Sequence, residues 1–197
     1  MGDENIMVAI VDNAVWVDHP DLADKVAAAW NVAHNNSNAN PPSWGSAADW
    51  SHGTHCSGLA VAATDNEIGV AGAGFNCSLM ASHAPAGSNP NGITHGYEGM
   101  QWAANNGADI INCSWGGSFY SQTSQNIINQ IHNQGVIIFA AAGNDNNTNP
   151  HYPSNYDNIV SVASIDYDDT KSSFSNYNSD VDVSSPVVSV RQDPQVF

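Results

Sequence analysis

The sequence predicts an α/β fold, a three-layer sandwich with a mainly parallel central sheet. Short, nearly continuous apolar runs alternate with longer segments in which apolar residues recur at helical spacing. Runs without polar alternation are typical of strands that are covered on both faces, as in a parallel sheet. The chain has 197 residues, of which 42% are hydrophobic, and this is enough for one domain with a core.

Five apolar, β-branched runs are the predicted strands. The first reads IMVAIV at 6–11 and leads into Asp12, and the others lie at 78–82, 109–114, 135–143 and 158–165. Three segments between them are predicted helices, at 54–63, 93–107 and 121–135. The first of these is rich in small residues and can pack closely on the sheet, and the other two end in glycine, a common helix stop. No internal repeat or linker is found, so we expect a single domain over 1–197.

The charge of the chain limits its partners. Nineteen acidic residues stand against three basic ones, for a formal net charge of −16. Phosphate binding needs clustered Lys and Arg, so we expect no nucleic-acid partner and no anionic membrane partner. No apolar run is long enough to span a bilayer, and the first residues do not resemble a signal peptide. The odd number of cysteines, Cys56, Cys77 and Cys113, argues against a disulfide framework.

Polar residues follow several predicted strands, at the edge where parallel sheets form their sites. Asp12 and Asn144 each come after an apolar run, and His52 precedes a helix. A histidine is the natural general base near neutral pH, and a buried aspartate can fix its tautomer. An asparagine amide can donate a hydrogen bond to a developing oxyanion. These residue types permit hydrolytic chemistry if the fold brings them together.

Four motifs occur in order along the chain: VAIVDNAVWVDHPDL (8–22), HGTHCSGLAVAATDNEIGVAG (52–72), INCSWGG (111–117) and VIIFAAAGND (136–145). Together they resemble the subtilisin family of serine proteases, from about Ile6 to about Val190. The resemblance implies a subtilisin-like fold and hydrolysis of peptide bonds in a polypeptide substrate by an Asp-His-Ser mechanism. It also implies secretion from the cell.

The resemblance assigns roles to individual residues. Asp12 matches the aspartate of the catalytic triad, His52 the general base and Asn144 the oxyanion donor. His55 matches a structural histidine, and Cys56 a position where some members carry a free cysteine beside the site. The residues matched to substrate binding are Ser114, Trp115 and Gly116 on one edge, Asn89 and Asn91 on the opposite edge, and Ala141, Ala142 and Gly143 in the specificity pocket.

Two departures from the family pattern stand out. Asp12 is followed by Asn13-Ala14, where the family usually has Ser or Thr and then Gly. In addition, the GTSxA motif that carries the nucleophilic serine does not occur in the sequence. We therefore expect a catalytic core that is incomplete at its C-terminus. The helix that normally follows the serine is also not found, which predicts an exposed apolar face covered by a separate segment or by self-association.

The segment TDNEIGV at 64–70 resembles the family's calcium loop. The matched ligands are the carboxylate of Asp21, the side chain of Asn66 and the carbonyls of Thr64, Ile68 and Val70. Oxygen ligands at irregular spacing suit the flexible coordination of calcium. The alternative is an acidic surface turn without an ion.

Two other functions are compatible with the sequence. One is a non-catalytic relative that binds peptides in the same groove. The other is a metal-dependent hydrolase that uses His52 and His55 with Asp12 or Asp49. The i, i+3 spacing of the histidines places them on one helical face, but a third ligand at zinc geometry is not evident.

Overall fold

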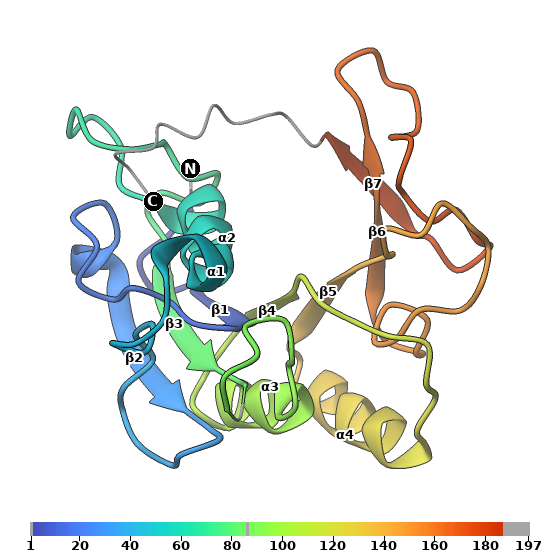
Figure 1. Ribbon diagram of the computed structural model, residues 1–197, viewed down its shortest axis with the longest axis horizontal. Helices are drawn as coiled ribbons and strands as arrows, with labels where there is room; N and C mark the ends of the chain where they lie inside the picture. The colour runs from blue at the N-terminus through green and yellow to red at the C-terminus, as the bar shows by residue number, and fades with distance from the viewer. Residues whose placement is uncertain (1, 86, 187–197) are drawn as a thin grey trace. The chain divides into compact units, whose positions relative to one another are not determined.

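The computed structural model describes residues 2–85 and 87–186. The chain divides into two compact units, the first ending at Ile111 and the second beginning at Asn112. Parallel strands alternate with helical elements along the first unit, and in the second unit one helix precedes three parallel strands (Figure 1). The predicted α/β fold is confirmed.

The first unit contains three parallel strands with β3 in the middle. They are β1 (Met7–Asp12), β2 (Val26–Asn31) and β3 (Ser78–His83). β3 pairs with both neighbours, so that Asp12 and Asn31 each lie opposite His83. The carboxyl ends of the three strands therefore share one edge of the sheet, and this edge carries Asp12.

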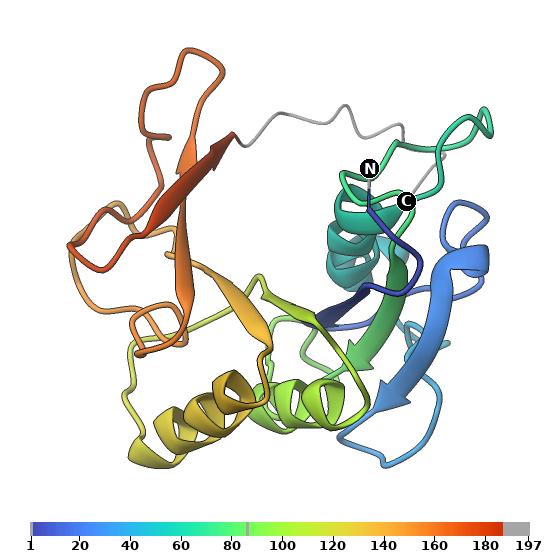
Figure 2. The ribbon, with the colours of Figure 1, turned by 180° about the vertical axis from the view of Figure 1, so that it is seen from behind.

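Helices cover both faces of these strands (Figures 1 and 2). The helical elements of the first unit are η1 (Ala23–Lys25), α1 (Ala47–Trp50), α2 (His52–Val61) and α3 (Gly96–Asn105). Val8 and Ile10 of β1 share a buried cluster with Val61 of α2. The next residue of β1, Val11, instead faces Gly99 of α3. Since alternate strand residues point to opposite faces, β1 is packed between two helices, as the predicted three layers require.

The second unit contains a second parallel ladder, with β6 in the middle. Its elements are α4 (Gln122–Asn133), β5 (Ile137–Ala141), β6 (Val160–Ile165) and β7 (Val183–Pro186), and β4 (Ile110–Cys113) crosses the boundary between the units. The α4 helix begins after Ser121, whose Oγ accepts a hydrogen bond from the Ser124 N–H. Its apolar face buries Ile128 and Ile131.

All five predicted strands and all three predicted helices are present, most of them a few residues shorter than predicted. The prediction missed β2, β7 and the short α1. β2 reads VAAAWN, and alanine is depleted in strands. β7 is exposed along its length, so it shows no buried apolar run.

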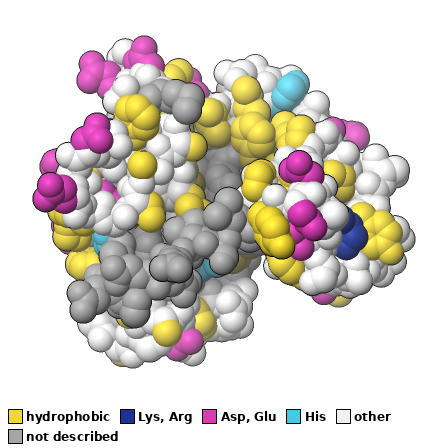
Figure 3. All heavy atoms as spheres, turned by 90° about the horizontal axis from the view of Figure 1, so that it is seen from above, with side chains coloured by type: hydrophobic (Ala, Val, Ile, Leu, Met, Phe, Trp, Pro, Cys, Tyr) yellow, Lys and Arg dark blue, Asp and Glu magenta, His cyan; other side chains and the backbone are white. Residues whose placement is uncertain are grey.

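Acidic side chains are spread over the face shown in Figure 3. No helix within the described ranges is long and apolar enough to cross a membrane.

Candidate active site

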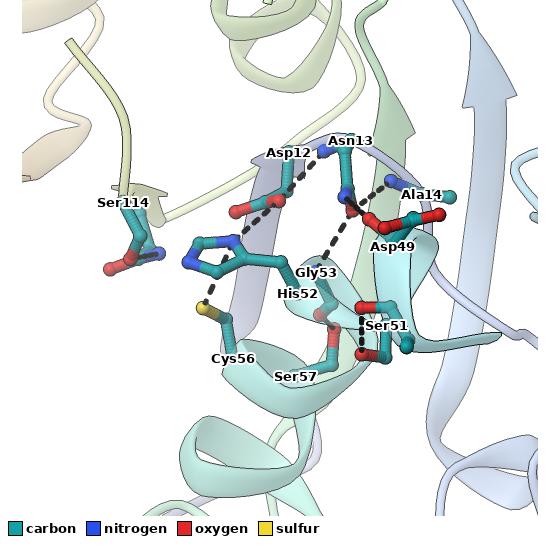
Figure 4. A network of polar contacts seen from close by, with 12 residues as sticks. Asp12, Asn13, Ala14, Asp49, Ser51, His52, Gly53, Cys56, Ser57 and Ser114 are labelled. Atoms are coloured by element: carbon teal, nitrogen blue, oxygen red, sulfur yellow. Dashed lines mark hydrogen bonds and ion pairs between the residues drawn. The ribbon is translucent and has the colours of Figure 1, made fainter. Parts of the chain in front are cut away.

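The end of β1 and the beginning of α2 bring an aspartate and a histidine into contact (Figure 4). Asp12 is the last residue of β1 and is 1% exposed. His52 is the first residue of α2, and its Nδ1 lies 2.8 Å from Oδ1 of Asp12. The backbone N–H of Asn13 donates to the same oxygen at 2.7 Å. This is the geometry by which a carboxylate orients a catalytic imidazole.

The surroundings of His52 favour its protonated form. The hydrogen bond to Asp12, followed by that to Cys56, raises the pKa of His52 above its ordinary value, although burial acts in the opposite direction. The side chain is 54% exposed, so the ring remains open to solvent on one side. Asp12 can therefore stabilise the imidazolium that forms when the histidine accepts a proton.

Asn13 joins the end of β1 to the first turn of α2. Its Oδ1 accepts hydrogen bonds from the N–H groups of Ala14 at 2.7 Å and Gly53 at 3.1 Å. Its Nδ2 donates to the carbonyl of Asp49 at 3.2 Å. Ser51, at the N-cap position of α2, makes no side-chain capping bond, so Asn13 supplies an acceptor to the first turn of this helix. The departure from the usual motif after Asp12 thus has a structural role.

Gly53 allows α2 to approach β1 closely. A Cβ atom at this position would lie 2.3 Å from the carbonyl oxygen of Ala14 and 2.8 Å from the Cβ of Asp12. Any side chain would push the helix, and His52 with it, away from the aspartate. The glycine after His52 is therefore required by the distance between the helix and the strand end.

The possible metal ligands in the described part of the chain gather in one place. Asp12, His52 and Cys56 are the only group of at least three such side chains whose ligand atoms lie within 4.8 Å of one another. His55 and Asp49 are not in this group. The structure therefore does not bring together the ligand set of the metal-hydrolase alternative. Asp49 instead accepts a hydrogen bond from the Ser46 hydroxyl at 2.6 Å.

The predicted substrate-binding residues of the second unit and Asn144 line shared cavities. A cavity of about 490 Å³ is lined by residues that include Ser114, Trp115, Gly116, Ala141, Gly143 and Asn144. Ala142 instead lines a smaller cavity of about 220 Å³, which Ser114 and Asn144 also border. The predicted residues Asn89 and Asn91 belong to the first unit, in an exposed turn where Oδ1 of Asn89 accepts a hydrogen bond from the Asn91 N–H at 3.0 Å.

The loop after α2 folds onto Asp21, which is 2% exposed. Oδ1 of Asp21 accepts a hydrogen bond from Asn66 at 2.7 Å, and Oδ2 accepts one from the Val70 N–H at 3.0 Å. Oδ1 of Asn66 accepts from the Ile68 N–H at 3.2 Å. The structure therefore brings the predicted carboxylate and amide ligands side by side, with the loop residues Ile68 and Val70. Within the described part of the chain, no hydrogen bond joins Thr64 to these residues.

Comparison with known proteins decides the family. A sequence model described as the subtilase family matches residues 3–192. The chain belongs to the subtilase family.

Individual relatives agree with this assignment. Thermitase of Thermoactinomyces vulgaris is 42% identical over 179 residues, covering 91% of this chain and 62% of thermitase. A halolysin-like extracellular serine protease of Natrialba magadii is 33% identical over 190 residues, covering 94% of this chain and 34% of the relative. A protease structure from Pseudoalteromonas arctica has a TM-score of 0.83 at 29% identity, covering 93% of this chain and 64% of that one. The chain thus spans less than two thirds of each of these relatives.

Two residues of this subtilase chain near the second-unit cavity were not found from the sequence. The imidazole of His151 lies close to two glycines: a Cβ atom on Gly116 would be 2.3 Å from the ring, and one on Gly143 would be 3.0 Å from it. Burial lowers the pKa of His151 below its ordinary value. Asn176 is 1% exposed and holds the loop after β5, accepting from the Asp145 N–H at 2.9 Å and donating to a carbonyl of that loop. Both lie in polar loop segments, where no local pattern marks them.

Proposed function

We propose that this chain supplies the base, the orienting carboxylate and the oxyanion donor of a subtilisin-like serine endopeptidase. The observation that carries the proposal is the 2.8 Å contact between buried Asp12 and half-exposed His52. In this reaction His52 takes the proton of the nucleophilic hydroxyl and passes it to the leaving amine. Asp12 stabilises the imidazolium between the two steps, and Asn144 donates a hydrogen bond to the oxyanion.

We propose a polypeptide as the substrate, bound in extended form. Ser114, Trp115 and Gly116 follow β4 directly and border the cavity of about 490 Å³. Backbone groups in such a strip pair with an extended peptide as an added strand, and a side chain of the peptide enters the cavity. The nucleophile is proposed to come from a residue outside these 197, because they contain no GTSxA motif.

The test is labelling with a fluorophosphonate probe, which reacts with activated serines. It is applied to the present chain and to the product of its full coding region. We expect labelling of the full product alone, and a loss of about 10⁶ in kcat for peptide hydrolysis in its His52→Ala variant, the order known for subtilisin itself. His55→Ala is the matched control, since His55 lies in the same helix but outside the contact with Asp12.

Two results would contradict the proposal. Labelling that survives in the His52→Ala variant at the wild-type rate would exclude His52 as the base. A coding region that stops after Phe197, together with an unlabelled chain that binds peptides, would support the non-catalytic relative.

Since a base acts only when unprotonated, we also expect the rate of peptide hydrolysis to increase with pH through the raised pKa of His52.

We further propose a structural calcium site formed by Asp21, Asn66 and the carbonyls of Thr64, Ile68 and Val70. Both oxygens of the buried Asp21 carboxylate are held by uncharged donors, so a cation would compensate a buried negative charge. Secretion is proposed as well, supported by the Natrialba magadii relative, which is described as extracellular.

A bound calcium would hold the loop after α2 against the turn that carries Asp21.

Thermal unfolding with excess calcium or with a chelator tests this site. A calcium concentration of about a hundred times Kd stabilises by about 2.7 kcal/mol, which corresponds to a rise in Tm of about 5–10 °C for a chain of this size. We expect the rise to disappear in Asp21→Asn and to persist in Asp65→Asn, a control within the same loop. Equal responses of the two variants would exclude the site.

A further inference from the structure

We propose that a cavity beside the first turn of α2 binds an alkylated ammonium group, such as the trimethylammonium head of a small organic cation. The cavity has a volume of about 370 Å³, and the residues that line it belong to the first unit. Two indole side chains, those of Trp16 and Trp50, line it, and Asp18 borders it. Binding at this cavity is independent of the proposed protease function, because neither Asp12 nor His52 lines it.

Hydrogen bonds hold the segment that carries Trp16. Its backbone N–H donates to Oγ1 of Thr54 on α2 at 2.9 Å, and the N–H of Val17 donates to Oδ1 of Asn40 at 3.0 Å. The Trp16 ring also packs at right angles to the ring of His19, with centroids 5.0 Å apart. Trp16 is nevertheless 45% exposed, so part of its indole surface is free. The segment is thus fixed at the cavity and presents aromatic surface to a ligand.

Trp50 is held at the cavity by contacts on other sides of its ring. It is 2% exposed, and its ring lies nearly parallel to that of the buried His83, at 9° and with centroids 5.8 Å apart. Gly45 lies against the edge of the indole, where a Cβ atom would be 2.4 Å from Cδ1 and 2.6 Å from Nε1. Both tryptophans are therefore in place before a ligand arrives, and little conformational entropy is lost on binding.

The polar groups of the lining favour an alkylated cation over a primary ammonium ion. Among the described residues that line the cavity, Asp18 is the only charged one, so its carboxylate favours a positive ligand. Oγ1 of Thr54 and Oδ1 of Asn40 already accept hydrogen bonds from the backbone. A primary ammonium ion brings three N–H donors, for which few acceptors remain. A trimethylammonium group needs no acceptor, and the faces of tryptophan rings attract it.

Isothermal titration calorimetry with choline tests the site in the intact chain. The comparison ligand is the neutral analogue of choline in which a carbon atom replaces the nitrogen, because the two molecules have nearly the same shape and differ in charge. We expect choline to bind with one-to-one stoichiometry and the neutral analogue to bind about tenfold more weakly, as the loss of a cation–π interaction requires. Failure of choline to bind, or equal binding of the two molecules, would overturn the proposal.

Variants locate the binding. Trp16→Ala should weaken choline binding by about tenfold, and Asp18→Asn by about two- to fivefold. Trp44→Ala and Asp24→Asn are the matched controls, because Trp44 is 62% exposed, Asp24 is exposed, and neither lines the cavity. Both should bind choline like the wild-type chain, and circular dichroism should show that all four variants are folded. Unchanged binding in Trp16→Ala, or an equal loss in Trp44→Ala, would assign the binding to other exposed aromatic surface and overturn the proposal.

Discussion

Replacing Asn13 by alanine tests how the active-site geometry is held. The side chain is 2% exposed and makes three hydrogen bonds, two of them as the acceptor for backbone N–H groups of Ala14 and Gly53. Truncation would leave both buried N–H groups without an acceptor, at about 1–3 kcal/mol each, so we expect a loss of about 2–6 kcal/mol. This is a large part of the 5–15 kcal/mol typical of a folded protein.

Equilibrium unfolding in urea measures this loss. With an m-value of about 2 kcal/mol/M, the midpoint should fall by about 1–3 M. Asn106→Ala is the control, because Asn106 is exposed and its side chain donates a single hydrogen bond within its own helix end. We expect it to change stability by less than about 0.5 kcal/mol.

An Asn13→Ala variant as stable as Asn106→Ala would refute the reasoning, since it would mean that solvent replaces these bonds at no cost. Titration of the His52 imidazole by NMR adds a readout of position. We expect the pKa of His52 to fall in Asn13→Ala, because the first turn of α2 loses its anchor at β1.

Three further predictions probe the two units. The pKa of His52 in the folded state is raised above 6.5, mainly by its hydrogen bond to Asp12. This pair therefore stabilises the fold fully below about pH 6.5, and the stabilisation decreases as the pH rises through the raised pKa. Asp12→Asn should remove this pH dependence of the unfolding free energy, measured by urea titration at several pH values. Gly53→Ala should lower the unfolding free energy by about 1–3 kcal/mol, whereas Gly117→Ala, where a Cβ meets nothing within 4 Å, should be tolerated. Asn176→Ala should lower it by about 1–3 kcal/mol in the same assay, because the buried carbonyl of Ala142 and the partly buried N–H of Asp145 lose their partner.

Local pattern predicted most of the fold. β1 and β3 are buried along nearly their whole length, so their residues form continuous apolar runs that can be recognised without knowing their neighbours. The same reasoning failed for β2, because its alanines carry no strand signal and its pairing with β3 decides its conformation. The resemblance to the family placed Asp12 and His52 in one site, and their 2.8 Å contact agrees with that placement.

The sequence by itself therefore determined the fold class and the family, since these depend on periodicity and on motifs read in order, and the same motifs predicted His52 as the base and Asp12 as its aspartate. Only the tertiary structure decided the contacts that tune the site. Asn13 anchors a helix 40 positions away, and Asn176 holds a loop 34 positions before it. The ligand atoms of Cys56 on α2 and Asp12 on β1 lie within 4.8 Å of each other because Gly53 lets α2 approach β1. Such contacts depend on which backbone groups the folded chain brings opposite one another, and no local pattern in the sequence encodes that.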